Sequence, residues 1–244
     1  MTSLALVIPC HNEAARLRTD EFLSALERFP FLTFCFVDDG STDATAETLA
    51  FLAHASPAID AIYLPKNIGK AEAVRAGVRH VLDRGVPEAV GFWDADLATP
   101  FDELPAFISA FTRDGGADAV IGARWPHLGG HVARSVFRSC TGTFMKQLIR
   151  LVLRAPVYDT QCGAKIFTRA AAEEIFRHPF ISPWLFDVEL LKRLGKERLS
   201  ARVREVPLDV WHDIPGSNLR LTDSFRLLGD LVRIAALPNS AGKV

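Results

Sequence analysis

The sequence has few cysteines and no long apolar run. Its 244 residues hold four widely scattered cysteines, at Cys10, Cys35, Cys140 and Cys162. They form neither a CxxC pair nor a zinc pattern, so we expect free thiols in a reducing cytosol. The longest apolar runs, such as residues 4–8 and 34–37, have the length of a strand. They fall short of the roughly 18 residues that indicate a membrane span.

The start of the chain lacks a basic segment, because an apolar, strand-like run begins at Leu4. We therefore expect no signal peptide and a cytoplasmic protein. The composition is 49% hydrophobic, which excludes a disordered chain. A length of 244 residues suits a single α/β domain over residues 1–244, with a small C-terminal addition.

Neither sign of charge dominates the whole chain, but the net charge of −1 conceals two unlike halves. Residues 1–122 hold 9 Lys and Arg against 18 Asp and Glu, a net charge of −9. Residues 123–244 hold 19 against 11, a net charge of +8. This asymmetry indicates metal chemistry in the first half and contact with anions or a membrane surface in the second. The alternative is an uneven spread over a solvated surface. Nucleic-acid binding is disfavoured, because the chain has no platform of basic and aromatic residues.

The first half alternates strand-like and helix-like segments. The patterns predict strands at residues 4–8, 31–37, 61–64, 90–93 and 119–122, and helices at 14–29, 44–54, 70–83 and 101–112. Such alternation predicts a parallel sheet that is buried on both faces, with ligands beyond the strand C-termini. The second half predicts helices at 132–153, 169–176, 184–194 and 222–237, and strands at 164–167 and 203–210.

Two acidic loops follow predicted strands. Asp38 and Asp39 precede Gly40, which permits a tight turn, and they can accept hydrogen bonds from base and ribose groups. Ser41 and Asp43 are explained by capping of the next helix, but capping does not explain two consecutive aspartates.

The second acidic loop is Asp94-Ala95-Asp96, directly after the apolar segment 90–93. Alternate residues of an extended segment point the same way, so both carboxylates can converge on one hard cation. An isolated Asp-x-Asp is common on solvated loops. Its place at the predicted ligand edge of the sheet favours a metal site that a nucleotide diphosphate completes.

Four motifs occur together in one order: Val7-Ile-Pro-Cys-His-Asn-Glu13, Val37-Asp-Asp-Gly-Ser-Thr-Asp43, Asn67-Ile-Gly-Lys70 and Asp94-Ala-Asp96. On these residues the chain resembles inverting glycosyltransferases of family 2, in their polyprenyl-phosphate sugar transferase branch. It is similar to the dolichyl-phosphate β-glucosyltransferase group through Asp159-Thr-Gln-Cys-Gly163, Phe186-Asp-Val-Glu-Leu-Leu191 and Ile214-Pro-Gly-Ser217. The resemblance covers roughly residues 4–220. It implies a GT-A fold, with a Rossmann-like, mostly parallel central sheet flanked by helices and a C-terminal extension on the acceptor side.

The resemblance also implies roles for single residues. Residues 1–122 would form the nucleotide-sugar-binding half, in which one or both of Asp38 and Asp39 bind the base or ribose. The remaining donor contacts would be Pro9, Asn12, Glu13, Lys70 and Asp94. Asp96 would be the main ligand of Mg²⁺ or Mn²⁺.

Residues 123–244 would form the acceptor and membrane-facing half. There the resemblance places Arg124 near the donor and acceptor phosphates and Arg138 at the acceptor phosphate, where Arg134 can assist. Asp187 matches an acidic position that faces the sugar. Asn218 departs from a common lysine, and Pro215 replaces an arginine of mannosyl relatives, which disfavours mannose as the sugar.

The segment 124–154 contains six Arg or Lys residues and no acid. A basic amphipathic helix can lie on an anionic membrane, so we expect a peripheral protein on the cytoplasmic face of the membrane. The alternative is a core helix with a solvated basic face.

The leading hypothesis is metal-dependent, inverting transfer of a hexose to a polyprenyl or dolichyl phosphate, with glucose from UDP-glucose as the expected donor. Two alternatives stay open. One is a glycosyltransferase that acts on a hydroxyl acceptor of a growing glycan, with Asp187 as its general base. The other is a catalytically silent module that binds nucleotide sugars.

Overall fold

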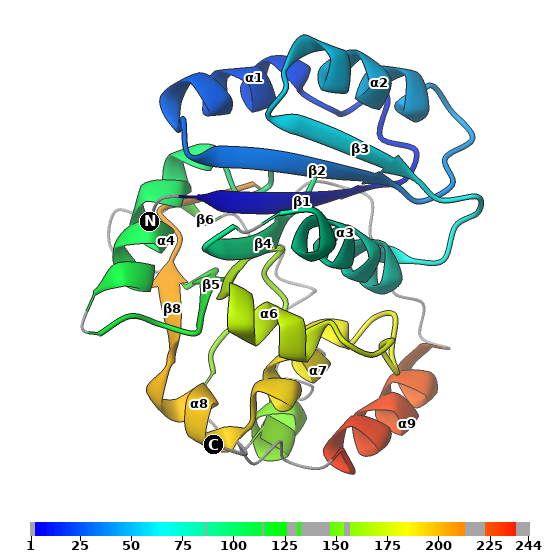
Figure 1. Cartoon of the computed structure of the whole chain (residues 1–244). Coiled ribbons are helices and arrows are strands. Elements are labelled where there is room, and N and C mark those ends of the chain that lie inside the picture. Colours follow the sequence, from blue (N-terminus) through cyan, green and yellow to red (C-terminus); the bar gives the residue numbers. More distant parts are fainter. Residues whose placement is uncertain are drawn as a thin grey trace.

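A computed structural model describes residues 3–85, 87–113, 115–125, 131–132, 147–153, 157–212 and 223–237. A mixed sheet forms the centre of the molecule (Figure 1). In spatial order its strands are β3 (Ile59–Tyr63), β2 (Leu32–Asp38), β1 (Leu4–Cys10), β4 (Ala89–Trp93), β7 (Ala164–Thr168), β5 (Ala119–Ala123) and β8 (Val203–Pro207).

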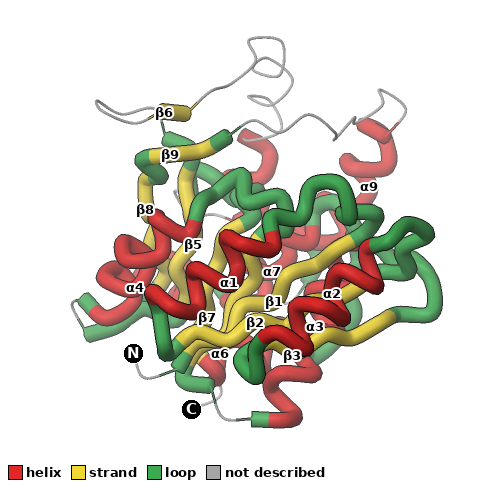
Figure 2. Tube along the Cα trace, turned by 90° about the horizontal axis from the view of Figure 1, so that it is seen from above, coloured by secondary structure: helices red, strands yellow, loops and turns green. Residues whose placement is uncertain are grey.

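Helices cover both faces of the sheet, because its central strands bury side chains on both sides. Leu4, Leu6 and Ile8 of β1 pack with α1 (Thr19–Arg28), α2 (Thr45–Ala55) and α4 (Leu104–Thr112), which follows a short 3-10 turn, η1 (Phe101–Glu103). Ala5 and Val7 face the opposite layer. That layer holds α3 (Lys70–Arg84), α6 (Arg169–Ile175), α7 (Phe186–Leu194) and α9 (Asp223–Ala235). Figure 2 shows α1, α2 and α4 running across one face of the strands.

Strand β7 is the exception to the parallel order. It lies between β4 and β5 and is antiparallel to both, with Lys165 opposite Phe92 on one side and Ile121 on the other. A Cβ atom on Gly91 would lie 2.2 Å from the carbonyl oxygen of Lys165, so glycine is needed where β4 and β7 approach. The structure therefore confirms a mostly parallel α/β sheet, and it adds an antiparallel strand from the second half of the chain.

Several predicted boundaries shift. The first helix begins at Thr19 rather than at residue 14, and the predicted strand 203–210 divides into β8 and β9 (Val210–Trp211). A helix over 132–153 is wrong at its start, because β6 (His131–Val132) pairs with β9 in a small second sheet. Residues 147–153 are helical, whereas 133–146 lie outside the described residues. Helix α8 (Lys196–Ala201) was not predicted. No helix in the described part of the chain is long and apolar enough to cross a membrane.

Candidate active site

The loops after β1 and β2 interlock at the carboxyl edge of the sheet. Asn12 has a positive φ of 54°, and its side-chain oxygen accepts a hydrogen bond from the backbone N–H of Thr42 at 2.8 Å. In return, the backbone N–H of Asn12 donates to the hydroxyl of Ser41 at 2.9 Å. The backbone N–H of Glu13 donates to the hydroxyl of Thr45 at 2.8 Å. These bonds hold Pro9 and Glu13 in place beside the cleft described below.

Asp38 and Asp39 organise the surrounding loops. Asp38 accepts from the backbone N–H of Ser41 at 3.1 Å. The two oxygens of Asp39 accept from the backbone N–H groups of Ile68 and Gly69, at 2.7 and 2.9 Å. Both carboxylates are buried. Asp39 thus fixes the turn that precedes Lys70, and base or ribose recognition by these two residues stays a prediction.

The loop after β4 presents two carboxylates. Lys70, at the first position of α3, donates to Asp94 Oδ1 at 2.5 Å. Asp96 accepts one hydrogen bond through Oδ1, from the backbone N–H of Ala98 at 3.0 Å. Leu97 follows with a positive φ of 50°, which is rare for a bulky residue. Such strain is stored where a functional loop must take one shape.

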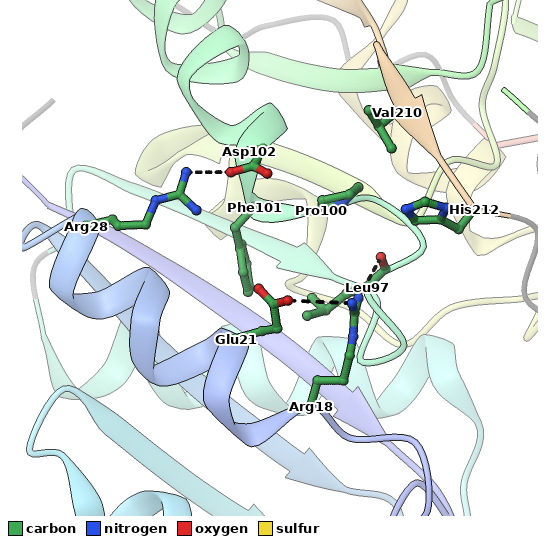
Figure 3. Close-up of a pocket in the computed structure, with 9 residues that line it drawn as sticks. All are labelled: Arg18, Glu21, Arg28, Leu97, Pro100, Phe101, Asp102, Val210 and His212. Carbon is green, nitrogen blue, oxygen red and sulfur yellow. Dashed lines mark hydrogen bonds and ion pairs between the residues drawn. The ribbon is translucent and has the colours of Figure 1, made fainter. Parts of the chain in front are cut away.

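A small cavity of about 250 Å³ lies beside this acidic loop, and residues that line it hydrogen-bond to the loop (Figure 3). Arg18 donates to the carbonyl oxygen of Leu97 at 3.3 Å, and the backbone N–H of His212 donates to the carbonyl of Ala98 at 2.9 Å. Arg28 and Asp102 form an ion pair at 2.5 Å in the same cavity. The hydrogen bonds to the carbonyls of Leu97 and Ala98 hold the strained turn from outside the main cleft.

The main cleft has a volume of about 590 Å³ and a lining of mixed polarity. Its walls come from the loops after β1, β4 and β5, from the start of α3 and from the region of α7. The residues that line it include Pro9, Glu13, Lys70, Asp94, Asp96, Arg124, Gln161, Gly163, Trp184, Phe186, Asp187 and Trp211. Seven of the predicted site residues therefore share one cleft. Asn12, Asp38 and Asp39 are not among its lining residues and instead accept hydrogen bonds from the backbone of nearby loops.

Arg124 is held rigidly at the cleft wall. Its Nε and Nη2 atoms donate to the carboxylate of Asp159 at 2.6 and 2.8 Å, and its guanidinium lies 5.2 Å from the ring centre of Trp211. Burial by itself would lower the pKa of Arg124, but Asp159 outweighs it and raises that pKa. Glu205 in turn accepts from the backbone N–H of Asp159 at 2.9 Å. Arg124 is therefore a cation in a fixed position, and the edge of its guanidinium group that carries Nε and Nη2 is bonded to Asp159.

A second buried ion pair lies beside the cleft. Lys165 Nζ donates to Asp187 Oδ1 and to the carbonyl of Cys162, both at 2.5 Å. Burial raises the pKa of Asp187, and the charges of Lys165 and Lys70 oppose that rise. Sequence reasoning missed Asp159, Gly163 and Lys165 as functional positions. The sequence did contain a signal for two of them, because Asp159 and Gly163 belong to the motif by which the chain resembles the dolichyl-phosphate β-glucosyltransferase group.

The acidic residues fit a divalent cation. Burial and the neighbouring Asp94 raise the pKa of Asp96, and burial, Asp96 and Asp94 raise that of Glu13 against the opposing charge of Arg16. Mutual repulsion of this kind is relieved by a bound cation. Among the described residues, no three acidic, His or Cys side chains form a complete site. A hard cation here would need additional oxygen ligands, such as those of a diphosphate.

Known proteins are similar to this chain in sequence and in fold. Residues 5–176 match Glycosyl transferase family 2, and the chain belongs to this family and is a glycosyltransferase. It is 36% identical over 242 residues to a dolichyl-phosphate beta-glucosyltransferase of Trichomonas vaginalis, with 94% of this chain and 69% of the relative covered. The corresponding human enzyme is 34% identical, with 88% of this chain and 69% of the relative covered.

A solved structure has the same fold. Glucosyl-3-phosphoglycerate synthase from Mycobacterium tuberculosis, in complex with Mn²⁺, UDP and glucosyl-3-phosphoglycerate, aligns with a TM-score of 0.70 at 18% identity. The alignment covers 98% of this chain and 82% of that one. At this identity the likeness establishes the GT-A fold.

A substitution at Gly163 tests the geometry of the acidic loop. A Cβ atom at this position would lie 1.8 Å from Oδ2 of Asp94. Since a carboxylate can rotate away while backbone cannot, Gly163→Ala should displace Asp94 from Lys70 and leave the fold intact. We expect roughly tenfold weaker binding of the nucleotide-sugar donor, the effect of one charge-assisted hydrogen bond. Calorimetry with UDP- and GDP-sugars measures this effect.

The matched control is Gly229→Ala in α9, where a Cβ atom meets nothing within 4 Å. Donor affinity should be unchanged in the control. The melting temperature of Gly163→Ala should fall by no more than about 4 °C, equivalent to about 1 kcal/mol in a chain of this size. Wild-type donor affinity in Gly163→Ala would show that the close packing on Asp94 has no role in binding.

Proposed function

We propose that this protein transfers glucose from UDP-glucose to a polyprenyl phosphate, with inversion at the anomeric carbon. The main support for this proposal is the similarity of the chain to dolichyl-phosphate beta-glucosyltransferases, which are 30–36% identical to it over 88–95% of its length. The cleft supports the proposal because it combines the carboxylates of Asp94 and Asp96 with the cations Lys70 and Arg124.

In the proposed reaction, the donor diphosphate lies beside Lys70, Asp94 and Asp96. An oxygen of the acceptor phosphate attacks the anomeric carbon from the side opposite UDP; the new carbon–oxygen bond forms as the bond to the diphosphate breaks. Lys70 and Arg124 stabilise the negative charge that develops on the leaving diphosphate. A divalent cation held by Asp96 would act as a Lewis acid on the same diphosphate.

The acceptor needs orientation more than deprotonation. A phosphate monoester has a second pKa of about 6, so it is mostly dianionic near neutral pH. We propose that Arg138, with help from Arg134 and Arg124, binds this group, because the guanidinium fork can contact two phosphate oxygens. Arg134 and Arg138 lie outside the described residues.

A second candidate is transfer to a hydroxyl acceptor, which requires a general base. Asp187 favours this candidate, because it lines the cleft and burial raises its pKa. The two candidates differ in their acceptor, and the acceptor experiment below separates them.

Metal dependence gives the first test. Asp96→Asn should reduce turnover at least about 100-fold, since a Lewis acid contributes several kcal/mol to charge stabilisation. An excess of chelator should abolish wild-type activity, and Mg²⁺ or Mn²⁺ should restore it. Asp102→Asn is the control, because Asp102 is exposed and pairs with Arg28 outside the cleft. Full activity in excess chelator would remove the metal from the mechanism.

The acceptor is identified by a screen of donors against polyprenyl phosphate, polyprenol and soluble glycans. We expect transfer to polyprenyl phosphate alone. Arg138→Ala should reduce this transfer by roughly 10–150-fold, the range of a hydrogen bond to a charged group, while UDP-glucose binding stays nearly unchanged. Arg138→Lys should recover only part of the activity. The exposed Arg177 serves as an Arg→Ala control. Equal activity with polyprenol would favour Asp187 as a general base.

We also propose peripheral binding to anionic membranes through the basic segment 124–154. Each surface cation contributes about 1 kcal/mol near anionic lipid, and salt screens that contribution. Flotation with anionic vesicles should recover the protein at low salt and lose it at high salt, with neutral vesicles as the control. An absence of binding at low salt would contradict the proposal.

A further inference from the structure

A fully buried lysine lies beneath the sugar-transfer cleft. Lys165 of β7 has no solvent exposure, and the neighbours of its ammonium group include three protein groups. These are the carboxylate of Asp187, the carbonyl of Cys162 and, at 5.1 Å from its centre, the ring of Phe92. Burial of an ammonium group is costly unless it is paired, so apolar packing alone does not account for a lysine here.

The strand that carries Lys165 has little freedom to move. β7 is paired on both edges, with Phe92 of β4 and Ile121 of β5 opposite Lys165. Its backbone lies so close to β4 that only glycine fits at position 91. The ammonium group is therefore a rigid anchor for Asp187.

Asp187 is the one member of this pair that lines the cleft. It lies in the first turn of α7, where the helix dipole also favours a negative charge. The charged groups that act on it are Lys165 from β7, Lys70 from α3 and Asp94 from the loop after β4. The charges of these side chains therefore alternate in sign in the order Lys165, Asp187, Lys70 and Asp94, and all but Lys165 line the cleft.

Asp187 lines the cleft and interacts electrostatically with Lys70 and Asp94. Asp94 interacts electrostatically with both Glu13 and Asp187. Lys70 and Asp96, which suit the diphosphate, share this central region. With the nucleotide placed at the interlocked loops after β1 and β2, which carry Glu13, the hexose would lie beside Asp187 and Trp184, which line the same cleft.

We propose that Lys165 is a positioning residue for the donor hexose: it holds the carboxylate of Asp187 at the floor of the cleft, where that carboxylate accepts a hydrogen bond from a sugar hydroxyl. This inference rests on the proposed function only in taking a UDP-hexose as donor. It applies whether the acceptor is a lipid phosphate or a hydroxyl group.

Removal of the positive charge of Lys165 shifts the pKa of Asp187 in a predictable direction. Burial raises the pKa of Asp187, and the positive charges of Lys165 and Lys70 lower it. Without the charge of Lys165, the pKa of Asp187 rises further, so a larger fraction of the carboxyl group is protonated on the acidic side. Deprotonation at higher pH restores the acceptor for the sugar hydroxyl.

The test compares Lys165→Met and Lys165→Gln with wild type between pH 6 and pH 9. At pH 6 the KM for UDP-glucose should rise at least about tenfold, as expected for loss of one charge-assisted hydrogen bond, and it should return toward the wild-type value by pH 9. The Kd for UDP, which lacks the hexose, should change less than about threefold. Turnover is measured with whichever acceptor wild type uses, so a wrong acceptor would contradict the proposed function and not this inference.

Arg193→Met is the matched control. Arg193 forms an ion pair with the fully buried Glu189 at 2.6 Å on the same helix, and neither residue lines the cleft. The control should lose thermal stability and keep the wild-type pH profile. Lys165 variants with wild-type KM at every pH, or with UDP and UDP-glucose weakened equally, would overturn the proposal. Failure of Lys165→Gln to fold would overturn it too, because the ammonium group would then be required for the fold itself.

Discussion

The cleft depends on the ion pair between Lys70 and Asp94, which joins the start of α3 to the loop after β4 at 2.5 Å. Neighbouring residues hold the two partners in position or leave room for them. Asp39 holds the turn before Lys70 through two backbone N–H groups, and Gly163 leaves room for the carboxylate of Asp94. This pair of opposite charges holds both side chains at the cleft, which Asp96 also lines.

Opposite charges alternate throughout the cleft. Arg124 is held by Asp159, Lys165 by Asp187 and Lys70 by Asp94. Isolated buried charges would destabilise the fold by several kcal/mol each, so this pairing is what permits so many ionic groups near one another. The exception is Asp96, which has one backbone hydrogen bond and a raised pKa. Burial and the charge of Asp94 cause that rise, and an added cation would relieve the repulsion between the two carboxylates.

Strand β7 explains why the second half of the chain is indispensable to this cleft. Antiparallel insertion between β4 and β5 brings Gly163 against Asp94 and Lys165 beneath Asp187. A purely parallel sheet would place β5 directly beside β4 and leave no residue to anchor Asp187. The part of the cleft around Asp187 is thus built by tertiary pairing with the second half of the chain.

The sequence by itself determined the alternating strands and helices of the first half and the carboxyl-edge loops that hold Asp94, Asp96 and Lys70. These follow from local periodicity and from short motifs in which neighbouring residues act together. It did not reveal that Asp39 binds loop backbone, that Lys165 is buried, or that residue 132 begins no helix. Those features are set by partners 22 to 79 positions away, such as Asp187 for Lys165, Ile68 for Asp39 and Trp211 for Val132. Only the tertiary structure decided them, because the energy of a buried charge or a strand pair depends on the distant group that satisfies it.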